Sequence, residues 1–203
     1  MKIFVGITGA SGSIYGGRLL RALVAAGHET TVCFSDGAVE VIRQEEYDAG
    51  LELLGAASEK VLEAFFSRHD ISPQAVEVAL PDNIGHVYSS GTALLDGAAV
   101  CPCSMSTAAS IAAGITGDLI HRVAGVALKE ARPLVVVPRE APLSEIHLQN
   151  LLRIRQAGGH VLPAAPAFYH NPQSIEDLVD FIAGKVLDLL GADHQLFKRW
   201  EGI

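Results

Sequence analysis

Short runs of apolar residues alternate along the chain with segments in which apolar residues recur every three or four positions. The runs predict buried strands, and the longer spacing predicts helices with one apolar face. The predicted strands cover residues 2–7, 29–34, 75–80, 97–101, 133–137 and 160–164. The predicted helices cover residues 14–26, 36–43, 58–68, 106–113, 118–130, 144–157 and 174–190. Strands and helices therefore take turns along almost the whole chain.

This order predicts an α/β fold of the Rossmann-like, doubly wound kind, with a mainly parallel sheet and helices on both faces. No linker or repeat interrupts the pattern, so residues 1–203 are expected to form a single domain. In such folds the ligand lies beyond the carboxyl ends of the strands. The strand-to-helix loops are therefore where we expect the chemistry.

Composition narrows the class of protein. Hydrophobic residues make up 49% of the 203 positions and aromatic residues only 6%, which suits aliphatic helices packed on a parallel sheet. The net charge of −8 argues against a nucleic-acid partner, because a polyanion needs a basic face. No apolar run matches a membrane span or a signal peptide. We therefore expect a cytoplasmic protein that binds no membrane.

Cysteines and histidines predict no metal site. The three cysteines, Cys33, Cys101 and Cys103, have neither the number nor the spacing of a disulfide framework or a zinc site. Cys33 falls in a predicted strand and is interpreted as core. Four scattered histidines are interpreted as surface or capping residues, because no carboxylate stands at ligand spacing: His86, His121, His147 and His170.

The first strand leads into a loop of small and hydroxylated residues, Thr8 to Ser13, and then into a helix. Backbone N–H groups and the positive end of a helix dipole meet at such a place, which predicts an anion site, here for a phosphate. The glycines at 6, 9 and 12 do not have the GxGxxG spacing, and no Walker lysine follows them. Ordinary turn glycines remain the alternative.

Ser35 and Asp36 directly follow the second strand. A dinucleotide site places an acid at the strand end, to hold the ribose hydroxyls. A serine there suits a phosphate or a ribityl hydroxyl better, which favours a mononucleotide. The alternative interpretation of Asp36 is a cap for the following helix.

Three hydroxyls, Ser104, Ser106 and Thr107, follow the buried strand that ends at Cys101. A helix N-cap needs only one of them. Three in four positions predict a donor-rich cradle for a phosphate or for the polar edge of a ring.

Cations gather in one stretch of this acidic chain: Arg122, Lys129, Arg132 and Arg139. Arg122 and Lys129 are two helical turns apart and so share a face. Arg139 and Glu140 directly follow a strand and are flanked by prolines, which predicts that both stand at the rim of the crevice. Solvation at the surface is the alternative for the other cations, and an ion pair with a neighbouring arginine is the alternative for Glu140.

Seven motifs together carry a family resemblance. They are Thr8-Gly9-Ala10-Ser11-Gly12, Cys101-Pro102-Cys103-Ser104 with Thr107, Leu128-Lys129-Glu130, Pro138-Arg139-Glu140-Ala141-Pro142, Pro163-Ala164-Ala165-Pro166, Phe168-Tyr169-His170 and Asp177-Leu178-Val179-Asp180-Phe181. The combination, nearly end to end, resembles the UbiX-type flavin prenyltransferases, a group of Rossmann-like flavoproteins. The resemblance implies a flavoprotein-type three-layer sandwich.

The resemblance also implies an activity. Enzymes of this family join the dimethylallyl group of dimethylallyl phosphate to N5 and C6 of reduced FMN. The product, prenylated FMN, serves UbiD-type decarboxylases of the ubiquinone pathway. The family further implies a homo-oligomer, a dodecamer, with the site built between subunits.

The family pattern assigns roles by position. It implies FMN contacts at Gly9, Ala10, Ser11, Ser35, Ser104, Met105, Ser106, Thr107 and Arg139. It implies prenyl phosphate contacts at Tyr169 and Lys185, joined by Arg122, Lys129, Arg139 and Glu140. Trp200 corresponds to an aromatic residue that covers the flavin in some members, so the tail, about residues 191–203, is expected at the active site or at subunit contacts.

The residue types fit that chemistry. Loss of an allylic phosphate leaves an anion, which arginines, lysines and the Tyr169 hydroxyl can hold, and a cation, which the rings of Tyr169 and Trp200 can shield. The sequence has no DDxxD-like cluster to hold magnesium, so a metal-independent reaction on a monophosphate is expected. Glu140 is the candidate for proton transfer, and Ser11 for a phosphate ligand or proton relay, or simply a turn residue.

Two other functions stay open. One is an FMN-dependent decarboxylase of peptidyl or pantothenoyl cysteine, although the histidine that such proteins carry after the first glycine loop is absent from Ser13-Ile14-Tyr15. The other is a non-catalytic FMN carrier, which would need the loop and the hydroxyls but neither Glu140 nor a second phosphate pocket.

Overall fold

The computed structural model describes residues 1–45, 57–200 and 202 of the chain. Its centre is a six-stranded sheet of order β3-β2-β1-β4-β5-β6, in which every neighbouring pair of strands is parallel. The strands are β1 (Lys2–Ile7), β2 (Glu29–Phe34), β3 (Glu77–Ala79), β4 (Gly97–Cys103), β5 (Leu134–Pro138) and β6 (His160–Val161). The predicted fold class is thus confirmed.

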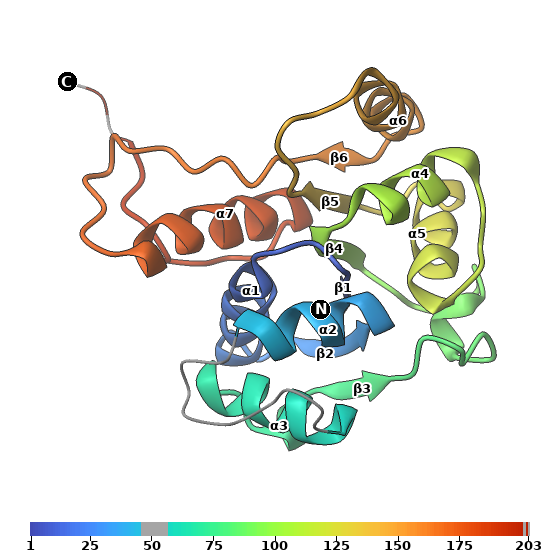
Figure 1. The fold of residues 1–203 in the computed structure, drawn as a ribbon, viewed down its shortest axis with the longest axis horizontal. Helices are drawn as coiled ribbons and strands as arrows, with labels where there is room; N and C mark the ends of the chain where they lie inside the picture. The colour runs from blue at the N-terminus through green and yellow to red at the C-terminus, as the bar shows by residue number, and fades with distance from the viewer. Residues whose placement is uncertain (46–56, 201, 203) are drawn as a thin grey trace.

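Helices cover both faces of this sheet (Figure 1). One face packs against α1 (Ser13–Ala25), α2 (Asp36–Glu45), α3 (Ser58–Arg68) and α7 (Ile175–Leu190). The other packs against α4 (Met105–Ala113), α5 (Leu119–Lys129) and α6 (Glu145–Gln156). Each interface has its own cluster of buried aliphatic side chains, as expected for a three-layer α/β sandwich.

The chain reverses its direction of winding between β1 and β4. From β1 it proceeds to β2 and β3 on one side of the sheet, and β4, β5 and β6 lie on the other side. The loops that leave β1 and β4 therefore diverge to opposite faces and open a crevice between them. The glycine loop and the hydroxyl cradle of the sequence belong to these two loops.

The predicted elements all exist, and their bounds differ in three instructive places. Strand β4 continues through Pro102, where a turn was predicted, with a cis bond before Pro102 and an irregular register before Cys103. Strand β6 has two residues rather than five: Leu162 and Ala164 still donate to the carbonyls of Val136 and Pro138, at 2.9 and 3.1 Å, but Pro138 has no N–H to donate in return. Strand β3 is shortened because Pro73–Ala75 forms a 3₁₀ turn.

Candidate active site

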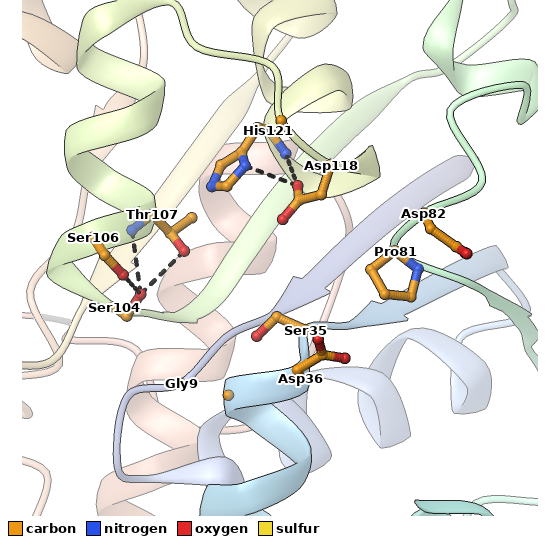
Figure 2. Close-up of a pocket in the computed structure, with 12 residues that line it drawn as sticks. Gly9, Ser35, Asp36, Pro81, Asp82, Ser104, Ser106, Thr107, Asp118 and His121 are labelled. Carbon is orange, nitrogen blue, oxygen red and sulfur yellow. Dashed lines mark hydrogen bonds and ion pairs between the residues drawn. The ribbon is translucent and has the colours of Figure 1, made fainter.

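A cavity of about 530 Å³ opens at the carboxyl ends of β1, β2 and β4, where the winding reverses (Figure 2). Its walls come from loops far apart in the sequence: Gly9, Ser35, Asp36, Gly37, Pro81, Asp82, Ser104, Ser106, Thr107, Gly117, Asp118 and His121. The predicted cofactor residues Gly9, Ser35, Ser104, Ser106 and Thr107 are thus brought together in one pocket.

Thr8 ties the loops of this pocket to one another. Its N–H and its hydroxyl both donate to the carbonyl of Pro102, at 3.2 and 3.0 Å. The same hydroxyl oxygen accepts the N–H of Ser104 at 2.7 Å, and the N–H of Ser35 donates to the carbonyl of Ile7 at 3.0 Å. Sequence reasoning placed Thr8 in the loop but gave it no role. Its role is to fix the two crevice loops side by side.

Two glycines form the floor of the pocket. A Cβ atom added to Gly9 would lie 3.1 Å from the Cα of Gly37, and one added to Gly37 would lie 3.3 Å from the Cα of Gly9. Backbone meets backbone here with no room for a side chain. The floor therefore presents bare peptide groups to whatever enters from above.

One wall carries the hydroxyl cradle. The Ser104 hydroxyl caps α4 by accepting the N–H of Thr107 at 3.2 Å, and it lies 3.0 Å from the hydroxyls of both Ser106 and Thr107. Figure 2 shows these three groups together on one side and Ser35, Asp36 and Asp82 on the other. The four remaining predicted FMN contacts do not line the pocket: Ala10 and Met105, which are buried, and Ser11 and Arg139.

Ser35, not Asp36, caps α2. The Ser35 hydroxyl accepts the N–H of Ala38 at 3.1 Å, and Asp36 is the first residue of the helix. The capping interpretation of Asp36 is therefore wrong, because a side chain one residue earlier already receives the first-turn N–H. The Asp36 carboxylate instead lines the pocket.

Asp118 and His121 form a pair at the pocket that sequence reasoning missed. Asp118 caps α5, and its Oδ1 atom accepts the N–H of His121 at 2.8 Å and lies 2.9 Å from the Nδ1 atom of the same residue. Burial alone would raise the pKa of Asp118, but its hydrogen bonds with His121 outweigh burial and lower it. An acid three residues before a histidine at a helix start was the available signal. His147, in contrast, completes the capping box of α6, as predicted for a capping residue.

The expected anion position at the start of α1 holds a carboxylate of the protein itself. Glu45 accepts the N–H groups of Gly12 and Ser13 at 2.7 and 2.8 Å, and the Ser13 hydroxyl at 2.7 Å. Gly12 has a φ of 101°, a left-handed conformation that favours glycine. Two amides of the loop in which the sequence predicts an anion site therefore bind a carboxylate of the protein.

Glu45 was missed because it stands at the end of α2, more than thirty residues from the loop that it binds. Burial alone would raise its pKa. Hydrogen bonds from the hydroxyls of Ser11 and Ser13 and from the two loop amides outweigh burial and hold the pKa below its ordinary value. Glu45 is therefore a fixed negative charge beside Ser11, a predicted site residue.

Arg139 and Glu140 directly follow β5, and neither lines the pocket. The Nε atom of Arg139 donates to the carbonyl of Ser11 at 2.8 Å, which joins the loop after β5 to the loop after β1. Glu140 is exposed, and its carboxylate accepts the N–H of Ala141 at 2.9 Å. It forms no ion pair with an arginine anywhere in the described part of the chain.

Arg122 and Lys129 lie along the segment 89–91, on the same face of α5. The Nε atom of Arg122 donates to the carbonyl of Ser89 at 3.2 Å, and Arg132 donates to the carbonyl of Gly91 at 2.7 Å. Lys129 pairs with Glu130 at 2.5 Å, beside Gly91. Arg122 and Lys129 are both exposed, so they are available to an anion from outside.

Tyr169, Trp200 and Lys185 belong to the other side of the molecule, around α7. The rings of Tyr169 and Trp200 meet edge to face with centroids 6.2 Å apart. The Nζ atom of Lys185 lies 3.4 Å from the Oδ2 atom of Asp188. Because α5 and α7 cover opposite faces of the sheet (Figure 1), one chain does not bring Arg122 and Lys129 to Tyr169 and Lys185.

The cysteines are structural. Cys33, Cys101 and Cys103 are free thiols in the core, and burial raises the pKa of Cys33 to about 12. Within residues 1–45 and 57–200, no three His, Cys, Asp or Glu side chains are grouped so that they could bind a metal ion. None of the described helices has the length and apolarity to cross a lipid bilayer.

Comparison with known proteins agrees with this geometry. The family model described as Flavoprotein matches residues 1–187. The flavin prenyltransferase UbiX of Methanothermobacter thermautotrophicus is 43% identical over 200 residues, which are 98% of this chain and 95% of the relative. The same enzyme of Aquifex aeolicus is 42% identical over 203 residues, at 99% of each chain.

A solved structure extends the likeness to three dimensions. The crystal structure of AnUbiX (PadA1) in complex with FMN and dimethylallyl pyrophosphate is 39% identical, covers 100% of this chain and 98% of its own, and superposes with a TM-score of 0.84. Full-length identity near 40%, a shared fold and a donor-lined pocket at the reversal of winding lead to one assignment: the chain belongs to the flavoprotein family and, within it, to the UbiX flavin prenyltransferases.

Proposed function

We propose that this chain transfers the dimethylallyl group of dimethylallyl phosphate to N5 and C6 of reduced FMN and releases phosphate, without a metal ion. The observation that carries the proposal is the pairing of a hydroxyl-lined pocket with a separate set of cations and aromatic rings. An FMN carrier needs only the first of these. A prenyl transfer needs both.

The pocket fits a flavin mononucleotide. Because Gly9 and Gly37 have no side chains, a ligand can approach the backbone at the floor of the pocket. The hydroxyls that line the pocket can donate hydrogen bonds to phosphate oxygens: Ser35, Ser104, Ser106 and Thr107. The pocket is also lined by the carboxylates of Asp36, Asp82 and Asp118, which can accept hydrogen bonds from the hydroxyls of a ribityl chain. We further assign Ser11, Arg139 and the backbones of Ala10 and Met105 to FMN.

The reduced flavin supplies electron-rich N5 and C6 atoms when it is bound. The protein's part is to hold the leaving phosphate and to exclude water. Lys185 on one side of the sheet and Arg122, Lys129 and Arg139 elsewhere supply preorganised positive charge for that anion, and the Tyr169 hydroxyl can donate a hydrogen bond to it. The exposed rings of Tyr169 and Trp200 can shield an allylic cation.

Glu140 is assigned to proton transfer, either to the departing phosphate or from C6 during ring closure. The side chain is exposed and is bound only by the Ala141 N–H in the described structure, so it is free to exchange protons. Ser11 lies between Glu45 and Arg139 and is assigned to the phosphate or to a proton relay.

We propose that chains assemble so that the two cation sets meet across subunits. A related structure is the dodecameric FMN-dependent UbiX-like decarboxylase of Escherichia coli O157:H7, 38% identical with a TM-score of 0.82 over all of both chains. Within the proposal, residues 1–203 form a single domain, its tail (about 191–203) adds to the site, and residues 201 and 203 lie outside the described part. The protein would act in the cytoplasm and supply a UbiD-type decarboxylase.

An anaerobic assay tests the proposal. Protein with bound FMN is reduced, dimethylallyl phosphate is added, and free phosphate and the mass of the cofactor are followed. We expect stoichiometric phosphate and a cofactor heavier by one five-carbon unit. A carrier would give neither product, and a cysteine decarboxylase would instead release carbon dioxide from a peptidyl or pantothenoyl cysteine.

Glu140→Gln removes the proposed proton carrier and keeps its shape. We expect turnover to fall by about 10²–10⁴-fold, the usual contribution of general acid–base catalysis, with FMN binding unchanged. Glu63→Gln, an exposed carboxylate on α3, is the matched control and should keep full activity. Unchanged turnover in Glu140→Gln would remove this residue from the mechanism.

A further inference from the structure

The C-terminal tail, defined here as residues 191–200, folds back along α7. Gly191 ends the helix with a φ of 75°, and the N–H of Ala192 donates to the carbonyl of Leu187 at 2.9 Å. From there the chain returns toward the start of the helix (Figure 1). Trp200 lies beside Tyr169 at the end of this path. The tail is therefore held by α7 of its own chain.

Gly184 allows the tail to lie close to the helix. A Cβ atom added to Gly184 would lie 2.5 Å from Cε1 of Phe197 and 2.6 Å from Cε1 of His194. Phe197 also packs on Phe181, with centroids 5.1 Å apart. A glycine inside a helix costs about 1 kcal/mol relative to alanine. Here the cost is offset by a contact that a side chain would prevent.

Asp188 fixes the charged part of the tail. Its Oδ1 atom lies 2.7 Å from Nη2 of Arg199 and 3.2 Å from Nε2 of His194. Burial alone would raise the pKa of Asp188, but hydrogen bonds and charge from Arg199 and His194 outweigh it and lower the pKa. Arg199 is the residue directly before Trp200, so this anchor sets where the indole ring stands.

The other oxygen of Asp188 faces Lys185, at 3.4 Å from its Nζ atom. This separation orients the ammonium group while leaving donors for a second anion. Two permanent cations, Lys185 and Arg199, share one carboxylate, so the cluster stays positive and can still attract a phosphate. The same residue thus holds both a proposed substrate ligand and the tail that carries Trp200.

We propose that Asp188 is a positioning residue that sets Lys185 and Trp200 together for the prenyl phosphate. The inference rests on the proposed function, because Lys185 and Trp200 have roles only there. The side-chain partners of Asp188 are Lys185, His194 and Arg199. Asp188 acts by reducing the number of conformations that Lys185 and the tail can adopt before the substrate arrives.

Asp188→Asn tests this inference, and Trp200, the single tryptophan of the chain, reports on the tail. We expect acrylamide to quench Trp200 fluorescence more strongly, by up to about one half, because Trp200 is 64% exposed in the anchored tail and becomes fully exposed on release. We expect KM for dimethylallyl phosphate to rise about five- to tenfold, the size of effect that the loss of one typical hydrogen bond produces. The Kd of FMN should not change.

Glu63→Gln is again the matched control, since it removes one negative charge from an exposed position on α3, away from the tail, and should match the wild type. Gly184→Ala gives a second, independent test: it pushes Phe197 and His194 away but keeps the carboxylate beside Lys185. It should raise Trp200 quenching as Asp188→Asn does, with a smaller change in KM.

Three results would overturn the inference: wild-type quenching and KM in Asp188→Asn, a lower KM, or an equal loss of FMN and prenyl phosphate binding, which marks a merely structural role. Failure of the proposed function is recognised separately, since the wild type itself would then release no phosphate. The quenching comparison would still report whether Asp188 anchors the tail.

Discussion

At the scale of single residues, the site depends on polar side chains that form hydrogen bonds within the protein and hold its loops in place. Thr8 and Glu45 are the main examples. Thr8 joins the loops after β1 and β4. Glu45 accepts hydrogen bonds from the amides at the start of α1. Neither is a predicted site residue. Each holds predicted site residues in place, since Ser104 and Ser11 are among its partners.

Thr8→Val removes the loop-joining hydroxyl and keeps the side-chain shape. The Ser104 N–H then loses its acceptor, so we expect a loss of about 1–3 kcal/mol in the free energy of unfolding and weaker FMN binding. Urea denaturation and flavin fluorescence titration measure the two effects. Thr30→Val, which removes a buried hydroxyl from β2, is the control and should leave FMN binding intact.

Glu45 predicts a dependence of stability on pH. Its folded-state pKa is lowered from 4.5, so its contribution is fully present above that value and is lost as pH falls through the folded-state pKa. The difference in unfolding free energy between the wild type and Glu45→Gln should be large at pH 7 and shrink below pH 4.5. A difference that stays constant with pH would show that the carboxylate is not charged in this role.

At the scale of elements, α1 and α7 are joined by an ion pair across their interface. The Nε atom of Arg18 donates to Oδ1 of Asp180 at 2.6 Å, and a second contact joins Nη2 of Arg18 to Oδ2 of Asp180. Asp180 is 9% exposed. The pair therefore orients the helix that carries Lys185 against the helix that follows the glycine loop.

A double-mutant cycle at this pair tests its role. Arg18→Met alone leaves a buried carboxylate unpaired and should cost about 2–4 kcal/mol, somewhat below the loss for a completely buried pair. The double variant Arg18→Met with Asp180→Leu should recover most of that loss. Thermal and urea denaturation give the four free energies. Simple additivity of the two single losses would contradict a direct interaction.

The same scale shows what periodicity can predict. Helix α3 and strands β1 and β2 have the predicted bounds, because apolar spacing alone defines them. Strand β4 does not, because Pro102 remains in the strand, where its carbonyl accepts from Thr8. That bond joins residues about ninety positions apart, and local pattern contains no information about such a contact.

At the scale of the whole molecule, the candidate site residues fall on two faces. Motifs predicted five of the residues that line the pocket, because the carboxyl ends of parallel strands must meet at one edge. Which chain supplies Arg122 or Tyr169 to a given site is not a local property, since it depends on how copies of the protein assemble. Asp118, His121 and Glu45 were missed for a related reason: their partners are set by tertiary contacts or by helix capping rather than by motif.

Mixing two inactive variants tests the shared site. If one chain supplies Arg122 and another supplies Tyr169, Arg122→Ala and Tyr169→Phe refolded together at equal amounts should restore about a quarter of the wild-type sites. Each variant alone should be nearly inactive. Sites built within one chain would give no recovery, because no chain would have both residues. Phosphate release under anaerobic conditions measures the outcome.

The contact between Gly9 and Gly37 has a consequence for how this protein can change. Neither position can accept even a methyl group without moving the backbone of the other, so no side chain can be added at the floor of the pocket. A change in ligand preference must then come from other residues that line the pocket, such as Asp82 and His121. An engineer who wants a different nucleotide here should randomise those residues and leave the two glycines alone.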